Sequence, residues 1–372
     1  MAGPFAPVEG PAAELRRSRQ LVHVMTSAVA ARRSADVLLA CGATPACVVR
    51  RAEVEAFVAK CGALCVNVGM LTEDRLEASL LAAGRARDLG VPWVLDPVAA
   101  GGSPARLRAC IELLNLGPRV VRGNPSEILA LWDAREQTRR QEGPEVGGRR
   151  GRGKRKRGAP RADAQAERPR GRGPDSTCDP EDGLRAARSL ASACSTIVCM
   201  TGAVDFIVGA EGGAGLDRAD EIQIEGGSSM CTAITGAGCA LSALIAAFVA
   251  AWDSARGEGA AARGGLPEGR EQLAARGGGA CLRPAGGGGA RPAPGARPAP
   301  GLPGDSRTPA AHACLLFKAA AARAARDARG PGSFAAALLD QLNLLSSGPR
   351  PPGPGGPRGG PPGGARALLS NR

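Results

Sequence analysis

The sequence contains no tyrosine, and its 372 residues include only six phenylalanines and three tryptophans. Proteins that bind single-stranded nucleic acid without sequence preference stack the bases on aromatic side chains. The scarcity of aromatic residues therefore argues against a nucleic-acid-binding surface of that kind. It also predicts a hydrophobic core built from alanine, valine, leucine and isoleucine.

Histidine is almost as scarce, because His23 and His312 are the only two. The twelve cysteines include no Cys-x-x-Cys pair. A structural zinc site needs four cysteine or histidine ligands, usually with two of them closely spaced, so the sequence predicts no zinc site. Scattered cysteines of this kind instead predict reduced thiols in an intracellular protein.

The N-terminus has no hydrophobic signal core, and Glu9 and Glu14 argue against a transit peptide, which is poor in acidic residues. The longest apolar run, residues 239–252, is too short to cross a membrane. We therefore expect no membrane partner and a cytoplasmic location, with an organelle as the alternative.

The formal net charge of +13 is unevenly distributed along the chain. Residues 139–173 hold 13 basic and four acidic residues, a local net charge of +9. Such a segment suits non-specific phosphate binding or nuclear import, but a tolerated insertion in a surface loop explains it as well. We favour the loop, so nucleic acid is expected to bind, if at all, only through this insertion.

Segments rich in glycine and proline divide the chain. We expect a flexible N-terminal tail at 1–20 and a flexible C-terminal tail at 346–372. Residues 21–345 then form a single domain, interrupted by a disordered basic insertion at 135–180 and a Gly/Pro/Ala-rich insertion at 254–310.

Short apolar runs alternate with segments of helical periodicity from residue 21 onward, which predicts an α/β fold with a mostly parallel central sheet and helices on both faces. Polar motifs follow these runs at Asn67, Asp96, 124–127 and 201–205. In such sheets ligands bind at the carboxyl ends of the strands, so these motifs are expected to form one site.

The most informative stretch is TAITGAGCALSALIAAFVAAW, residues 232–252. Gly236 and Gly238 predict a tight turn into an apolar helix, whose first N–H groups and dipole suit an anion such as phosphate. Cys239 falls in the first helical turn, where that field is expected to lower the pKa of the thiol toward neutrality. The alternative is a glycine-capped core helix with an ordinary cysteine.

A base beside a phosphate site suggests phosphoryl transfer, which also needs a cationic clamp and carboxylates that hold Mg²⁺. Arg122 is the candidate clamp, Asp96 and Glu127 are the candidate metal ligands, and Thr201 is a candidate phosphate contact. Taken singly, a carboxylate of this kind is more often a helix cap or a salt-bridge partner.

The motifs VLDPVAAGGSPAR, RGNPSEILAL, TGAVDFIV, TGAGCALSALIAAF and GPGSF occur in this order. In this they resemble hydroxyethylthiazole kinase, over about residues 21–132, 182–252 and 311–345. The resemblance implies a ribokinase-like fold and transfer of the ATP γ-phosphate to the hydroxyl of 4-methyl-5-(2-hydroxyethyl)thiazole in thiamine salvage. It also implies Mg²⁺ and a homotrimer with sites between subunits.

The resemblance matches Arg122 and Thr201 to ATP-binding residues, Cys239 to the catalytic cysteine and Gly236 to the glycine that opens the anion hole. We also predict that Asn124 and Asp205 bind ATP and that Asp96 and Glu127 bind the metal. The predicted anion-hole and substrate-binding residues are Gly236, Ala237, Gly238, Cys47, Ser27 and Gly69.

Three positions depart from the family pattern, all on the thiazole side. Ser27 in MTS stands where the family has asparagine, Cys47 stands where it has a methionine, and EGGSS at 225–229 replaces NGHP. These departures keep two alternatives open, a kinase for another vitamin-like alcohol such as hydroxymethylpyrimidine, or a catalytically weakened relative.

Overall fold

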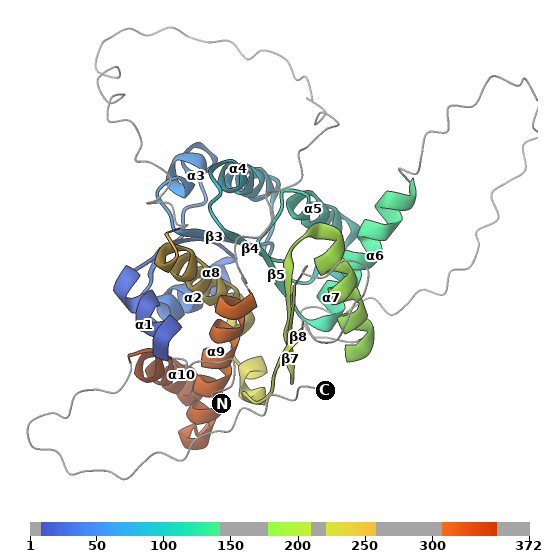
Figure 1. Ribbon diagram of the computed structural model, residues 1–372. Helices are drawn as coiled ribbons and strands as arrows, with labels where there is room; N and C mark the ends of the chain where they lie inside the picture. Colours follow the sequence, from blue (N-terminus) through green and yellow to red (C-terminus); the bar gives the residue numbers. More distant parts are fainter. Residues whose placement is uncertain (1–8, 142–177, 210–220, 258–306, 348–372) are drawn as a thin grey trace, which may run out of the picture.

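The computed structural model describes residues 9–141, 178–209, 221–257 and 307–347 (Figure 1). An eight-stranded sheet with the order β2-β1-β3-β4-β5-β6-β7-β8 lies at its centre. The strands are β1 (Leu21–Met25), β2 (Thr44–Ala46), β3 (Ala63–Asn67), β4 (Trp93–Asp96), β5 (Val120–Gly123), β6 (Ile197–Met200), β7 (Asp205–Val208) and β8 (Glu221–Ile224). Strands β1 to β6 pair in parallel, whereas β7 and β8 add an antiparallel edge.

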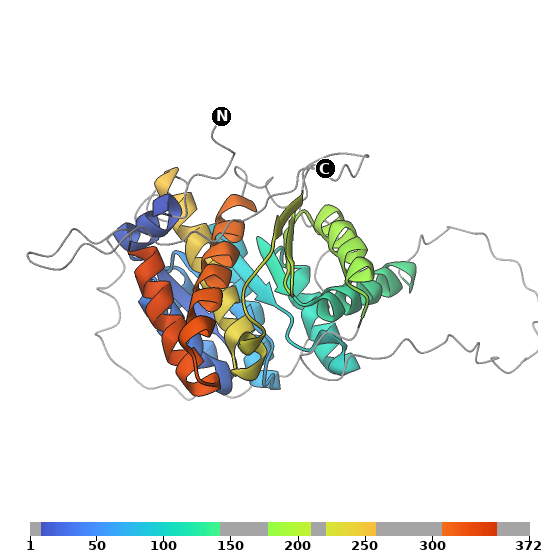
Figure 2. The same ribbon diagram turned by 90° about the horizontal axis from the view of Figure 1, so that it is seen from below.

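Helices cover both faces of this sheet, as the alternating pattern predicts (Figures 1 and 2). They are α1 (Glu9–Ser18), α2 (Ala28–Ala40), α3 (Arg51–Val58), α4 (Glu73–Leu89), α5 (Pro104–Leu114), α6 (Pro125–Gln141), α7 (Pro180–Cys194), α8 (Ala237–Ala255), α9 (Arg307–Asp327) and α10 (Pro331–Ser346). One hydrophobic cluster joins the sheet to α1, α2, α8, α9 and α10, and a second joins the opposite face to α3 through α7. The expected fold class is therefore confirmed.

The inner strands are apolar along their whole length because helices bury them from both sides. All five residues of β3 are buried, and so are all four of β4. The helix between them begins at Thr72, whose hydroxyl accepts the Arg75 N–H, and ends at Gly90 in the left-handed conformation with φ 64°. The two caps set where α4 begins and ends, so the connection from β3 to β4 brings the carboxyl ends of both strands to the same edge of the sheet.

Helix α8 crosses the sheet within the first cluster and contacts β3 and β4. Its 19 residues exceed the 14 of the apolar run at 239–252, and among the described residues it is the helix long enough to span a membrane. However, 78% of its most apolar window is buried within the fold. It is therefore the central core helix of this domain.

The N-terminal tail expected at 1–20 is wrong for residues 9–18, which form α1. Ala12 and Leu15 are fully buried against the cluster around α8, and burying a leucine contributes about 2 kcal/mol. Arg16 donates to Ala40 O at 2.5 Å, to Asn343 O at 3.1 Å and to Ser346 Oγ at 2.7 Å. It thereby ties α1 to the ends of α2 and α10.

Both expected insertions are shorter than predicted at their ends. Helix α6 continues through 135–141, helix α8 continues to Ala255, and helix α9 already begins at Arg307. The remaining residues of the basic insertion, of the Gly/Pro/Ala-rich insertion and of the C-terminal tail lie outside the described residues, except at 178–180, 256–257 and 346–347.

Candidate active site

The polar motifs that follow the strands meet at one edge of the sheet. Asn67 ends β3, Asp96 ends β4, Asn124 follows β5 and Thr201 follows β6. Asn67 and Asp96 are paired across the sheet, and the Thr201 N–H donates to Gly123 O at 2.9 Å. The N-terminus of α8 lies over the same edge, because Gly238 in its first turn lies against the Arg122 guanidinium. The structure therefore brings the strand-end residues and the start of α8 together at one edge of the sheet.

Asp96 is a fully buried carboxylate at the centre of this edge. Its Oδ2 accepts hydrogen bonds from Asn67 Nδ2 at 2.7 Å and from Ser242 Oγ at 2.9 Å, whereas its Oδ1 has no hydrogen-bond partner. Burial raises the pKa of Asp96, while Arg122 and the two hydrogen bonds oppose the rise. An unpartnered oxygen on a buried carboxylate is costly unless it binds something else.

Glu127 connects the loop that follows Asp96 to the turn between β5 and α6. Asn124 and Glu127 form a reciprocal cap at the start of α6, in which Asn124 Oδ1 accepts the Glu127 N–H at 2.9 Å and Glu127 Oε2 accepts the Asn124 N–H at 2.8 Å. Glu127 Oε1 accepts the N–H of Ala99 at 2.8 Å, where the backbone has a φ of 53°. Burial, reinforced by Asp96, raises the pKa of Glu127 to about 7. The carboxylate therefore has a clear structural role.

Arg122 reaches from β5 to the start of α8. Its Nη2 donates to Thr201 Oγ1 at 2.6 Å, and its Nε is buried without a partner. Withdrawal from water opposes its charge, but Asp96 and Glu127 outweigh that effect and raise the pKa of Arg122. A Cβ atom on Gly238 would lie 2.6 Å from Arg122 Nη1. The guanidinium thus packs directly on the backbone of the helix N-terminus.

The helix end itself has the geometry that the glycine turn predicts. Gly236, which has no side chain to cap the helix, is the N-cap of α8 in the left-handed conformation with φ 80°, and Ala237 is the buried first residue. A Cβ on Gly236 would lie 3.2 Å from Ala30 Cα, so a side chain there is excluded by α2 as well. This close approach fixes where the free N–H groups of α8 point.

Cys239 lies in the first turn of α8, as expected, but its charge state does not follow the expectation. Burial and, next, the negative charge of Asp96 raise the pKa of its thiol to about 12, although Arg122 and Asn67 oppose the rise. The dipole of α8 was expected to lower this pKa. The sequence reveals neither the burial of this thiol nor the influence of Asp96 on it, and both raise its pKa.

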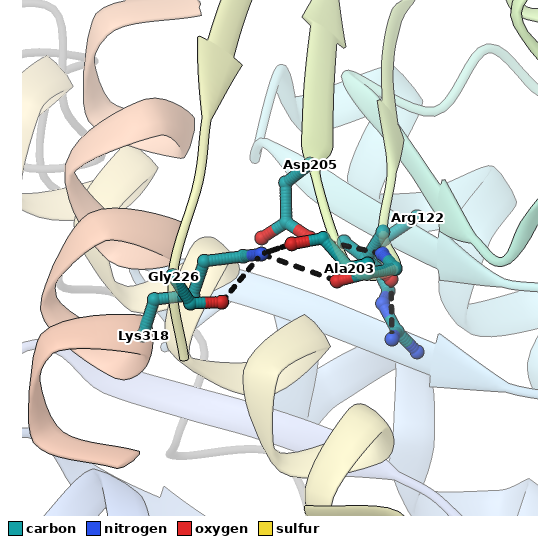
Figure 3. A network of polar contacts seen from close by, with 7 residues as sticks. Arg122, Ala203, Asp205, Gly226 and Lys318 are labelled. Carbon is teal, nitrogen blue, oxygen red and sulfur yellow. Dashed lines mark hydrogen bonds and ion pairs between the residues drawn. The ribbon is translucent and has the colours of Figure 1, made fainter. Parts of the chain in front are cut away.

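Asp205 occupies the far end of the β6–β7 turn. Its Oδ1 accepts the Gly202 N–H at 2.9 Å and lies 3.3 Å from Lys318 Nζ (Figure 3). Burial raises the pKa of Asp205, while Lys318 is the main opposing influence and Arg122 a weaker one. Because Arg122 influences the pKa of Asp205, the two residues and Lys318 belong to one charged cluster.

The remaining predicted residues lie toward β1 and β2. Gly69 follows β3, and its N–H donates to Asn67 Oδ1 at 2.9 Å. A Cβ on Gly69 would lie 3.1 Å from the Cβ of buried Ser27, the N-cap residue of α2. Cys47, which follows β2, is exposed. The structure therefore joins Ser27 and Gly69 to Asn67 and leaves Cys47 at the surface.

Comparison with known proteins identifies the family of the chain. The sequence profile of the hydroxyethylthiazole kinase family matches residues 12–143 and 162–264. The chain belongs to the hydroxyethylthiazole kinase family. A hydroxyethylthiazole kinase of Klebsiella pneumoniae subsp. pneumoniae is 39% identical over 328 residues, which cover 88% of this chain and 91% of that protein. Another from Tolumonas auensis is 33% identical over 90% of this chain and 91% of its own length.

A solved structure supports the same fold. The hydroxyethylthiazole kinase protein from Pyrococcus horikoshii OT3 superposes with a TM-score of 0.60 at 23% sequence identity, covering 91% of this chain and 92% of that one. The mostly parallel sheet and its two helical layers thus agree with the ribokinase-like fold that the resemblance implies. The profile match begins inside α1, which is consistent with α1 being part of the folded domain.

The donor atoms present fit one carboxylate ligand for Mg²⁺ better than two. Among the described residues, no group of three or more His, Cys, Asp or Glu side chains could hold a metal ion by itself. Mg²⁺ on a nucleotide needs fewer protein ligands, because it is bound by phosphates, water and one or two carboxylates. Asp96 Oδ1 is available for this purpose, whereas both oxygens of Glu127 already accept backbone N–H groups.

Two residues of the site, Ser242 and Lys318, are absent from the predicted set. The strand-end pattern places Asn67 at the site but assigns it no role. Ser242 lies one turn after Cys239 on α8, so helical periodicity places it on the same side. The sequence indicates Lys318 only weakly. The residue stands out because lysine is rare in this arginine-rich chain and because its neighbours in the helix are mostly alanine.

A buried histidine supports the loop that carries Cys47 and makes stability depend on pH. His23 Nε2 lies 2.7 Å from Val48 O, so this nitrogen donates, and Nδ1 is buried without a partner. Burial lowers the pKa of His23 below its usual 6.5, with the Val48 contact opposing. As the pH falls through 6.5 the unfolded chain therefore binds the proton first, and the folded state loses stability.

We expect the free energy of unfolding of the wild type to fall, relative to that of His23→Gln, as the pH is lowered from 7 to 5. Glutamine keeps a donor for Val48 but does not titrate. Urea denaturation at each pH provides the measurement, and the difference between the two chains cancels the opposing contribution of Glu127, whose raised pKa favours the folded state at low pH. If the free energies of unfolding of the wild type and His23→Gln changed in parallel with pH, His23 would not be the cause of the pH dependence.

Proposed function

We propose that the protein transfers the γ-phosphate of ATP to the primary hydroxyl of 4-methyl-5-(2-hydroxyethyl)thiazole. Membership of the hydroxyethylthiazole kinase family supports the reaction and the substrates. The observation that carries the proposal is the Arg122 guanidinium, packed on Gly238 at the N-terminus of α8 and electrostatically coupled to buried Asp96. Cation, helix end and carboxylate are the parts that a phosphoryl-transfer site requires.

The chain's own groups would act mainly through electrostatics. Arg122 and the free N–H groups at the start of α8 would bind the phosphates, with Thr201, Asn124 and Asp205 forming the rest of the nucleotide side. Donors already aimed at the transferring group stabilise the charge that develops there without further rearrangement. Each such group contributes on the order of 3 kcal/mol to lowering the barrier.

Asp96 is the residue that we propose to hold Mg²⁺, and Glu127 supports it by fixing the neighbouring loops. When bound, the ion would neutralise phosphate charge and orient the phosphates. The unpartnered Oδ1 of Asp96 supports this assignment. Asn67 and Ser242 hold the other oxygen and so determine which way the carboxylate faces.

The acceptor alcohol would bind on the side of Ser27 and Gly69, next to the sulfur of Cys239. We further propose a homotrimer in which Cys47 contacts the substrate of a neighbouring subunit, as the resemblance implies. The exposure of Cys47 in the isolated chain supports this proposal. Light scattering during gel filtration would test it, since a monomer at micromolar concentration contradicts the shared site.

Cys239 would act as a thiol that positions the hydroxyl, because a pKa of about 12 leaves little thiolate at neutral pH. A loose transition state for phosphoryl transfer asks little of a base, since the hydroxyl proton departs late. We expect Cys239→Ala to lower kcat about 10- to 100-fold, less than a full general base contributes at its upper limit.

The rate profile between pH 6 and 9 distinguishes the two roles of Cys239. A positioning thiol predicts profiles of the same shape for the wild type and Cys239→Ala. A rising limb that is present only in the wild type would instead show a thiolate base. Cys194→Ala, at the end of α7, serves as the matched control and is expected to have wild-type activity.

One assay tests the proposed function itself. Purified protein is incubated with Mg-ATP and a set of alcohols that includes hydroxyethylthiazole and hydroxymethylpyrimidine, and ADP release is followed. We expect the highest kcat/KM with hydroxyethylthiazole. A preference for the pyrimidine would contradict the proposal and would attribute the change to the altered thiazole side, Ser27 and Cys47. No turnover of any alcohol would identify a catalytically inactive relative.

A further inference from the structure

The ammonium group of Lys318 lies within an oxygen cage between three segments that are distant in the sequence. Its Nζ donates to Ala203 O at 2.7 Å, to Gly202 O at 3.1 Å and to Gly226 O at 3.3 Å, and it lies 3.3 Å from Asp205 Oδ1 (Figure 3). The side chain comes from α9 and is only 7% exposed. A buried ammonium is tolerated when all of its donors are used and a counter-charge is adjacent, and both conditions are met here.

The carbonyl groups in this cage belong to irregular backbone. Gly202 and Ala203 form the exposed turn between β6 and β7, and Gly226 lies in the loop after β8. Gly226 and Gly227 have φ of 99° and 87°, a conformation that other residues rarely adopt. A Cβ on Gly227 would also lie 3.3 Å from Lys318 Cγ. The two glycines of EGGSS therefore let this loop close around the lysine stem.

The same turn leads directly into the proposed nucleotide side. Thr201, which receives the hydrogen bond from Arg122, is bonded through the backbone to Gly202. Asp205 interacts electrostatically with both Lys318 and Arg122. The contacts of Lys318 Nζ are with Gly202, Ala203, Asp205 and Gly226, so its influence on Arg122 and Thr201 passes through the 201–205 turn.

We propose that Lys318 is the positioning residue of the nucleotide side: it holds the 201–205 turn and the loop after β8 in the conformation that binds ATP. The proposal rests on the proposed function, since it assigns a role within the same site. It is a role for a lysine in particular. An ammonium is a compact charge with three donors, whereas a guanidinium is a planar fork that does not match three converging carbonyl groups. Lys318 is one of four lysines among 48 basic residues, so arginine is the common choice elsewhere in the chain.

The test is to remove the ammonium and to ask which substrate is affected. We expect Lys318→Ala to raise the KM and the dissociation constant for ATP about 10- to 100-fold. The reason is that no ammonium then holds the carbonyl groups of the 201–205 turn and of the loop after β8 together. The KM for the alcohol should change less than about twofold. Lys60→Ala removes an exposed lysine on the far side of the sheet and should leave both constants unchanged.

Chemical rescue separates positioning from a general loss of structure. Lys318→Ala keeps the carbonyl groups of the cage and opens space between them, so millimolar methylammonium or ethylammonium is expected to draw them together again and to restore ATP affinity in part. Tetramethylammonium at the same ionic strength has no N–H donor and should have no effect. Lys318→Arg should not rescue, since the fork does not fit the cage.

A second variant protects the test against misfolding of the first. Lys318→Ala combined with Asp205→Asn leaves no unpaired buried charge, so we expect it to fold. Its affinity for ATP should be lower than that of Asp205→Asn alone, which carries the same change on the nucleotide side. Calorimetric titration with ATP needs no acceptor, so the inference is tested separately from the proposed function. A wild type that binds ATP but phosphorylates no alcohol overturns the function alone. Equal ATP affinity in the wild type and Lys318→Ala, or the absence of amine rescue, overturns the inference alone.

Discussion

Gly238→Ala is expected to lower kcat/KM about 10²- to 10³-fold while making the fold slightly more stable than that of the wild type. The added Cβ would lie 2.6 Å from Arg122 Nη1, 2.9 Å from Nη2 and 3.1 Å from Cζ. The separations from the two nitrogen atoms are shorter than any normal Cβ contact, so the guanidinium must move. In moving it would lose the 2.6 Å hydrogen bond to Thr201 and its place against the helix end. Loss of one aligned donor in a charged site costs about 10²- to 10³-fold in rate.

The free energy of unfolding is expected to rise while kcat/KM falls, so a loss of activity cannot be attributed to unfolding. Gly238 lies inside α8 and has no positive φ, and alanine is favoured over glycine in a helix by up to about 1 kcal/mol. The valine variant, Gly238→Val, adds a second clash and should be inactive. Steady-state kinetics and urea denaturation would be measured on the same preparations.

The matched control is Gly84→Ala, a helical glycine of α4 whose Cβ would meet nothing within 4 Å. It should gain similar stability and keep full activity. If Gly238→Ala kept wild-type kcat/KM, the guanidinium would be shown to move at no cost, and Arg122 could not be the fixed clamp that we propose.

The sequence predicted the strand-end residues because their position depends on local pattern alone. Apolar runs end at Asn67 and Asp96, and parallel strands must bring such ends to one edge. The reciprocal cap of Asn124 and Glu127 is also local, yet the motif alone predicts Glu127 as a metal ligand. Both readings suit a carboxylate after a strand, and only the two backbone N–H groups bound to it reveal the structural role.

What the sequence did not reveal depends on contacts between distant segments. The pKa of Cys239 is raised by burial and by Asp96, which lies 143 positions earlier in the chain. Lys318 acts on a turn more than 100 residues before it. Helix α1 was missed because proline and arginine suggested a tail, whereas Leu15 is held by packing against the rest of the fold. Tertiary burial outweighs local composition in each case.

Asp96→Asn is expected to lower kcat about 10²- to 10³-fold at saturating Mg-ATP. Asparagine has the shape of aspartate and can still accept hydrogen bonds from Asn67 and Ser242, so the packing of this buried position is kept. What is lost is the negative charge that faces Arg122 and the unpartnered oxygen that we assign to Mg²⁺. Ser27→Ala removes one neutral contact of about 1 kcal/mol and should cost less than about tenfold.

The two functions of the Asp96 charge have opposite effects on nucleotide affinity, and this provides the decisive measurement. Without metal, in EDTA, the carboxylate repels the triphosphate, so Asp96→Asn should bind ATP at least as tightly as the wild type. With Mg²⁺ the order should reverse, and the variant should need a higher Mg²⁺ concentration for half-maximal rate, because one ligand is gone. Equal losses in Asp96→Asn and Ser27→Ala, with no reversal between the two conditions, would contradict both the metal role and the assignment of the phosphate side to this edge of the sheet.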